Sequence, residues 1–144
     1  MLTIKRLEIE EAQILIDGAA AKAREITVPM CIAVCDESGH LIRFDRMDGG
    51  KVSSISIAID KAFTGAVARR GTHVYNQLCV PGNQTFGIHI TNEGHFSVIG
   101  GGLPVFVDGE IVGGIGLSSG TAEQDLVCAE AAIAHFHERN GHKP

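Results

Sequence analysis

The first clear hydrophobic pattern spans residues 9–25 and has the period of a helix. Apolar side chains recur every three or four positions, and charged side chains fill the positions between them. The residues on the predicted inward face are Ile9, Ala12, Ile16, Ala19 and Ala23. The pattern therefore predicts an amphipathic helix, and Pro29 ends the connection that follows it.

Two strands are predicted after this helix. Residues 30–36 (MCIAVCD) form a short apolar run typical of a buried strand, and residues 41–47 (LIRFDRM) alternate between two faces. The intervening DESGH has the composition of a turn. We expect these two strands to form an antiparallel hairpin.

Residues 53–70 (SSISIAIDKAFTGAVARR) predict a second long helix, with Ser53 or Ser54 as its N-cap. The opening S-I-S-I-A-I would also suit a strand, but the length of the segment and its alanines favour a helix. The residues expected to face inward are Ile55, Ile59, Ala62 and Ala66. Residues 72–78 (THVYNQL) predict one more short helix.

The second half of the chain predicts two hairpins and a final helix. Residues 86–91 and 95–100 flank the turn NEG, and residues 104–108 and 110–117 flank the strong hairpin signal Asp108-Gly109. Over residues 121–141, Thr121 and Gln124 form a capping box and Asn140-Gly141 supplies a stop. We therefore expect one α/β domain of the α+β type over residues 1–144, with a mainly antiparallel sheet of five or six strands and helices packed on it.

Composition and charge narrow the range of partners. The chain of 144 residues has a net charge of −5, and its only tight basic cluster is Arg69-Arg70, so nucleic acid is not an expected partner. No apolar run approaches the roughly 20 residues that span a bilayer, and the N-terminus lacks the apolar core of a signal peptide. These features indicate a cytoplasmic protein with no membrane partner.

The four cysteines, Cys31, Cys35, Cys79 and Cys128, make no C-x-x-C pair. Residues four apart on a strand share a face but lie too far apart to bridge, which excludes a disulfide between the first two. We expect all four to be reduced, as small apolar residues.

The glycine-rich stretch GGIGLSSGTAEQD, residues 113–125, resembles a phosphate-binding loop only superficially. Ser119 occupies the third glycine position of a dinucleotide fingerprint, no lysine follows as in a Walker loop, and acids in the first helical turn would repel a phosphate. Two interpretations remain. The glycines allow close packing against a helix, or they form a pocket floor with Glu123 or Asp125 at its rim.

Four motifs in this order resemble the GlcG/HbpS-type haem-binding family, also called the haem-degrading domain, which includes the C-terminal domain of PduO-type proteins. They are PMCIAVCDESGHLIRFDRMDG, SIAIDKAFTGAVARR, IGGGLPV and VGGIGLSSGTAEQD, and the resemblance extends from Leu2 to Phe136. It implies a profilin-like sandwich with an antiparallel sheet, a homo-oligomer, and haem as a cofactor.

Several residues are candidates for a ligand site. Arg46 and Lys61 could together bind a carboxylate or haem propionates, beside Met47, and Asp48, Glu123 and Asp125 could act as acid–base groups. Close backbone approach at three consecutive glycines predicts a pocket wall shared with the glycines of the 113–125 stretch. The residues of this wall are Gly100, Gly101, Gly102, Pro104, Gly114 and Gly116.

The resemblance also implies an iron ligand, which some haem-binding relatives are thought to place on the first helix. Residues 9–25 contain no His, Met, Cys or Tyr, so the candidate axial ligands are His73, Tyr75, His95 and Met47. No dedicated metal motif is present. The best metal alternative is His89 with His95, which the hairpin predicted around NEG would bring together.

Three functions follow as hypotheses. The first is a protein that binds haem or a related tetrapyrrole and degrades it slowly. The second is a small catabolic enzyme (a hydrolase, isomerase or lyase) whose organic-acid substrate is held by Arg46 and Lys61. The third is an oligomeric accessory protein without turnover. The expected ligand in the first two is a small, anionic molecule.

Overall fold

The computed structural model describes residues 1–144, and its order of elements follows the predicted one except in one segment. The helices and strands, in chain order, are α1 (Ile9–Glu25), β1 (Cys31–Asp36), β2 (Leu41–Arg46), α2 (Ser54–Ala68), α3 (Thr72–Leu78), the short 3-10 helices η1 (Ile88–Ile90) and η2 (Asn92–Gly94), β3 (Gly102–Val107), β4 (Glu110–Ser118) and α4 (Ala122–Asn140). This arrangement is the α+β class that the periodicity predicted.

The four strands form one antiparallel sheet in the order β2-β1-β4-β3. The predicted hairpin β1–β2 is confirmed, and so is the hairpin β3–β4. The turn residues of the β3–β4 hairpin, Asp108 and Gly109, have φ values of 51° and 78°. A two-residue turn of type I′ requires positive φ at both residues. β1 and β4 are the central strands, and every residue of β1 is buried.

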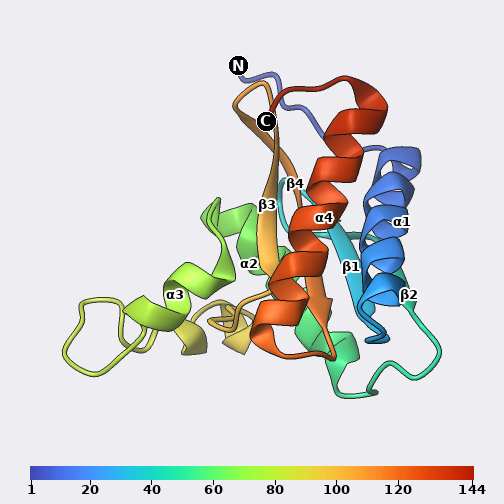
Figure 1. Cartoon of the computed structure of the whole chain (residues 1–144). Helices are drawn as coiled ribbons and strands as arrows, with labels where there is room; N and C mark the ends of the chain where they lie inside the picture. Colours follow the sequence, from blue (N-terminus) through green and yellow to red (C-terminus); the bar gives the residue numbers. More distant parts are fainter.

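Helices cover both faces of the sheet (Figure 1). α1 and α4 lie side by side on one face, and α2 lies on the other. The larger apolar core fills the space between the sheet and the helices α1 and α4. Its largest fully buried side chains are Leu15, Ile16, Met30, Ile32, Ile115, Leu117 and Phe136. The smaller core under α2 is built from alanines and cysteines.

The small residues explain how closely α2 approaches the sheet. A Cβ atom at Gly116 would lie 2.1 Å from the carbonyl oxygen of Ala58, and one at Gly114 would lie 2.4 Å from that of Ala62. Both glycines are buried, and they face the α2 backbone. Close helix packing therefore takes the place of the pocket floor that the sequence suggested at these two residues.

The segment from residue 86 to residue 100 corrects the prediction of a third hairpin. It contains η1 and η2 in place of two strands, so the sheet has four strands and not five or six. Gly87, Asn92, Glu93 and Gly94 all have positive φ, which interrupts an extended chain. α3 and the loop that follows it project from the body of the molecule (Figure 1), whereas His95 and Ser97 are hydrogen-bonded to Thr64 of α2, and no part of the segment pairs with a strand.

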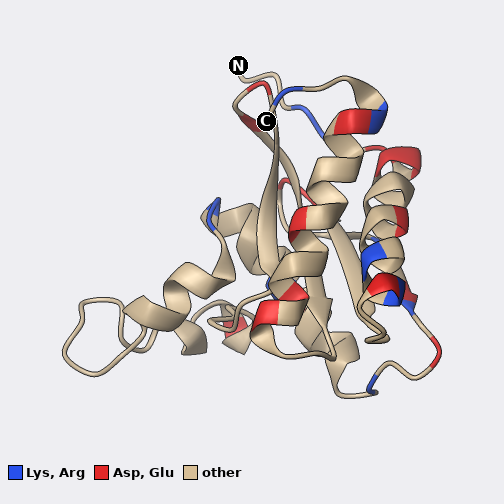
Figure 2. Cartoon of the chain, viewed as in Figure 1, with Lys and Arg blue, Asp and Glu red and all other residues tan.

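The predicted ends of α4 are confirmed: Thr121 and Gln124 form its capping box, and Gly141 ends it with a φ of 66°. Ser53 stands at the N-cap position of α2, but its side chain makes no capping hydrogen bond. Acidic side chains stand on the first turn of α4 (Figure 2), where the helix dipole favours them. None of the helices is both long enough and apolar enough to cross a membrane.

Candidate functional site

A cleft of about 200 Å³ lies where the start of α3, the loop before β3 and the start of α4 meet. The residues that line it come from three separate parts of the chain: His73, Asn76, Gln77, Gly100, Ala122, Glu123 and Leu126. Most of these side chains can donate or accept hydrogen bonds. The sequence had singled out His73, Gly100 and Glu123 separately, and the structure brings these three together.

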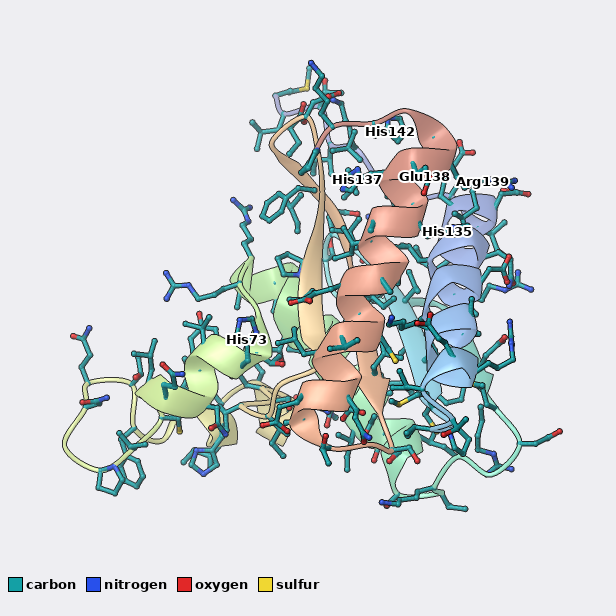
Figure 3. The ribbon with its side chains drawn as sticks, in the orientation of Figure 1. His73, His135, His137, Glu138, Arg139 and His142 are labelled. Atoms are coloured by element: carbon teal, nitrogen blue, oxygen red, sulfur yellow. The ribbon has the colours of Figure 1, made fainter.

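His73 is held in the cleft by its neighbours. The adjacent Thr72 is buried, and its Oγ1 accepts a hydrogen bond from the backbone N–H of Gly102 at 2.9 Å, which ties α3 to β3. The missing side chain at Gly71 makes room for the imidazole, because a Cβ there would stand 2.6 Å from the Nδ1 of His73, and the Cβ of His73 lies 3.2 Å from where a Cβ at Gly100 would stand. Figure 3 shows His73 on the side of α3 nearest to the body of the molecule.

The imidazole of His73 has an unused polar atom. Its Nδ1 is shielded from solvent and has no hydrogen-bond partner in the protein. Buried polar nitrogens are normally paired, because leaving one unpaired costs about 1–3 kcal/mol. Among the residues that line the cleft, His73 is therefore the one with a buried nitrogen that makes no hydrogen bond.

Lys61 and Asp125 form a buried ion pair behind the cleft. The Nζ of Lys61 lies 2.8 Å from Oδ2 of Asp125 and also donates to the carbonyl of Leu117 at 2.9 Å. The other carboxylate oxygen of Asp125 accepts the backbone N–H of Gly120 at 3.0 Å. The anion that Lys61 meets is therefore a carboxylate of the protein itself.

Gly101 joins this ion pair to the cleft wall. A Cβ at Gly101 would stand 2.6 Å from the Cβ of Asp125 and 3.0 Å from the Nζ of Lys61, and the residue has a φ of 122°. Both charged side chains are almost completely shielded from solvent. The pair thus fixes the glycine loop against α2 and α4, and its burial does not match the catalytic contact with a ligand that was predicted for Lys61 and Asp125.

The predicted anion clamp of Arg46 and Lys61 is not assembled. Arg46 is exposed at the end of β2, whereas the ammonium of Lys61 is fully engaged inside the protein. Asp48 is exposed in the turn after β2, and Met47 packs partly against the main core. These residues do not line the cleft with His73 and Glu123.

The other predicted wall residues lie within the sheet. Gly102 and Pro104 belong to β3, where they pair with Gly116 and Gly114 of β4. A Cβ at Gly102 would stand 2.3 Å from the carbonyl oxygen of Lys61, so this glycine also serves close packing against α2. Of the predicted glycine wall, Gly100 is the residue that lines the cleft.

The remaining axial candidates have partners within the chain. The ring of Tyr75 meets that of Phe96 edge to face at 4.9 Å, and the guanidinium of Arg70 lies 5.9 Å from its centroid. His95 bonds to Asp60 through its Nδ1 at 2.8 Å. Of these candidates, His73 lines the cleft, and its Nδ1 is packed against Gly71.

The hairpin that would have paired His89 with His95 is absent. His89 instead contacts Cys79, at 3.1 Å between Nδ1 and Sγ. No group of three or more His, Cys, Asp or Glu side chains is placed to hold a metal ion. All four cysteines are free, as predicted.

Sequence reasoning missed Asn76 and Gln77, the two amides of the cleft. The available signal was their position one helical turn after His73 in a short helix, since residues three and four apart share a face. A short helix with few apolar residues gives no strong periodicity, so the amides were not distinguished from ordinary exposed polar residues.

Comparison with known proteins identifies the family of this chain. The model of the family "Haem degrading protein HbpS-like" matches residues 7–134. An uncharacterized 15.0 kDa protein from the dhaT-dhaS intergenic region of Citrobacter freundii is 37% identical over 135 residues, which cover 94% of this chain and 95% of that protein.

Solved structures agree with this match. Protein ORFY of Klebsiella pneumoniae superimposes with a TM-score of 0.92 at 32% identity, covering 94% of each chain. The structure described as a PduOC:heme complex gives a TM-score of 0.86 at 29% identity, covering 90% of this chain and 94% of that one. The resemblance seen in the sequence motifs is thereby confirmed, and the chain belongs to the HbpS-like family.

Proposed function

We propose that this protein binds haem or a related tetrapyrrole, with His73 as the iron ligand. The observation that carries the proposal is a histidine, His73, that lines a cleft in a chain whose fold matches a haem complex. Imidazole is a common axial ligand of haem iron. The first helix offers no alternative, because α1 contains no His, Met, Cys or Tyr.

The cleft is too small to hold a whole porphyrin. Its volume of about 200 Å³ is below the ~300–1,000 Å³ of ordinary ligand pockets, so a porphyrin would extend beyond it. Exposed apolar residues stand next to its lining in the sequence: Ile99 precedes Gly100, and Val127 follows Leu126. A flat ligand bound through His73 would therefore lie partly outside the cleft.

The direct test is a titration of the purified protein with hemin, followed by absorption spectroscopy. The proposal predicts a shifted Soret band that saturates at a defined stoichiometry. Iron-free protoporphyrin is the control for adsorption to apolar surface, and it should bind more weakly because it cannot use the imidazole. A Soret band that remains that of free hemin would contradict the proposal.

Slow breakdown of the bound haem is a finer proposal that rests on the family description. Bound haem would supply redox-active iron, which reacts with oxygen when a reductant is present. The expected result is loss of the Soret band, with release of iron, in the presence of reductant and oxygen. A Soret band that stays stable under these conditions would contradict haem breakdown, and only haem binding would then remain proposed.

The size and polarity of the cleft favour a second candidate, a small organic acid. Asn76, Gln77 and His73 would donate hydrogen bonds to its carboxylate, and Glu123 would act as the acid–base group. Titration calorimetry with short-chain carboxylates tests this candidate. A small organic acid would be favoured over haem if the wild type bound a carboxylate saturably and did not respond to hemin. Gln77→Ala should then lose the carboxylate binding.

Self-association is a further proposal, and it is supported by two large apolar side chains that are exposed in the segment after α3. Phe86 and Ile90 are 56% and 73% exposed, which a partner surface would cover. Light scattering of the wild type and of Phe86→Ser with Ile90→Ser tests it. The proposal predicts an oligomer that the double substitution dissociates, and a monomeric wild type would contradict it.

A further inference from the structure

Cys79 differs from the other three cysteines in its surroundings. Cys31, Cys35 and Cys128 are buried in the core, and burial raises the pKa of all three thiols, that of Cys35 to about 12 and that of Cys128 to about 11. Such thiols stay protonated and unreactive at neutral pH. Cys79 is partly exposed at the end of α3, so it is the thiol that a reagent in solution can reach.

An imidazole stands next to this accessible thiol. The Sγ of Cys79 lies 3.1 Å from Nδ1 of His89, which is within hydrogen-bond distance for sulfur. The loop between the two residues is anchored: the Oγ1 of Thr85 donates to the carbonyl of Leu78 at 2.7 Å, and the Nδ2 of Asn83 donates to the same carbonyl at 3.2 Å. The two side chains are thus held together by a structured turn.

A carboxylate also lies near His89. His89 lines a cavity of about 270 Å³ together with Asp60 of α2, whose carboxylate bonds to His95. A nucleophile within hydrogen-bond reach of a base is the usual arrangement for an activated cysteine.

We propose that Cys79 and His89 form a reactive thiol pair that is oxidised by hydroperoxides. His89 accepts the thiol proton, and the thiolate attacks the terminal oxygen of the hydroperoxide. A bond between Sγ and this oxygen forms while the O–O bond breaks, so the sulfur is oxidised to a sulfenic acid and the peroxide is reduced. The leaving alkoxide takes the proton back from His89, and the products are the sulfenic acid and an alcohol.

The test measures the reactivity of each cysteine separately by peptide mass spectrometry. The folded protein is treated with iodoacetamide over a series of pH values, and in parallel with cumene hydroperoxide and dimedone, which traps sulfenic acid. We expect Cys79 to carry the label in both reactions. Replacing His89 by Ala should slow alkylation of Cys79 by about tenfold near pH 6, with the difference vanishing at alkaline pH where any thiol is ionised.

Two controls make the result specific. His95→Ala removes an exposed imidazole that does not touch the thiol, and it should leave the rate at Cys79 within about twofold of wild type. His89→Asn serves as a second variant and should behave like His89→Ala. Superimposable pH profiles for wild type and both His89 variants, or labelling of the buried cysteines as fast as Cys79, would overturn the proposal.

Discussion

Lys61 and Asp125 are the residues on which the arrangement around the cleft most depends. Their side chains are buried and joined at 2.8 Å, and each makes one more hydrogen bond to the backbone. Removing one partner leaves the other as an unpaired buried charge. We therefore expect Lys61→Met to lower the free energy of unfolding by about 3–5 kcal/mol, measured by urea denaturation.

A double variant separates the cost of an unpaired charge from the value of the pair itself. Lys61→Met with Asp125→Leu removes both charges, and it should be more stable than Lys61→Met alone because apolar replacement of a whole buried pair is often tolerated. Equal or greater loss in the double variant would mean that the pair itself stabilises the fold.

A second prediction at this scale concerns Glu37, which holds the N-terminal segment through Arg6. The guanidinium donates to both carboxylate oxygens, at 2.8 and 2.6 Å, and lowers the pKa of Glu37 from about 4.5 to about 2. A lowered carboxyl pKa contributes stability that is complete above pH 4.5 and is lost as the pH falls toward 2. The Tm advantage of wild type over Arg6→Gln should therefore shrink across this range.

Calorimetric scans of both proteins at several pH values between neutrality and pH 2 would measure this difference. Arg24→Gln is a suitable control, because this arginine on α1 has no salt bridge in the structure. A Tm difference between wild type and Arg6→Gln that does not change with pH would contradict the assigned role of the Glu37 carboxylate.

Among the elements, α2 and β4 are joined more closely than ordinary side chains would allow. Because a Cβ at Gly116 would overlap the carbonyl of Ala58, Gly116→Ala should push α2 away from the sheet and cost about 1–3 kcal/mol or more. Thermal or urea unfolding measures this cost. In Gly100→Ala the nearest atoms are side-chain carbons at 3.2 and 3.6 Å, so this control should lose much less.

These elements also illustrate what a sequence can predict. Long helices and the Asp108-Gly109 hairpin were predicted correctly because their signals are local: a repeating period, a cap and a turn pair. Residues 86–91 and 95–100 alternate like strands but lack a partner strand, and positive φ at Gly87 and Gly94 turns the chain. Strand formation depends on pairing and packing, which a local pattern does not contain.

The candidate site was harder to predict than the fold for the same reason. His73, Gly100 and Glu123 were each noticed, but their meeting depends on how α3, the glycine loop and α4 pack. The anion that pairs with Lys61 is Asp125 of the protein and not a ligand. Neither the charge of the lysine nor its position on the helix could indicate this partner. Residue chemistry suggested the right groups, and tertiary packing determined which of them face an open cleft.

At the scale of the whole molecule, the sheet with α1, α4 and α2 forms the body, and α3 with the loop after it forms a projection (Figure 1). The cleft lies at the junction of the two, where His73 from the projection faces Glu123 from the body. A ligand bound there would contact both parts. We expect binding to raise the Tm of the protein, because a ligand that binds only the folded state stabilises it.

The most direct test of haem binding through His73 is a hemin titration of three proteins: wild type, His73→Ala and His95→Ala. The imidazole of His95 is exposed and bonded to Asp60, so this variant controls for loss of a surface histidine. We expect wild type and His95→Ala to give the same saturable Soret shift, and His73→Ala to bind hemin at least about tenfold more weakly, with an altered spectrum. An unchanged titration of His73→Ala would contradict haem binding through His73.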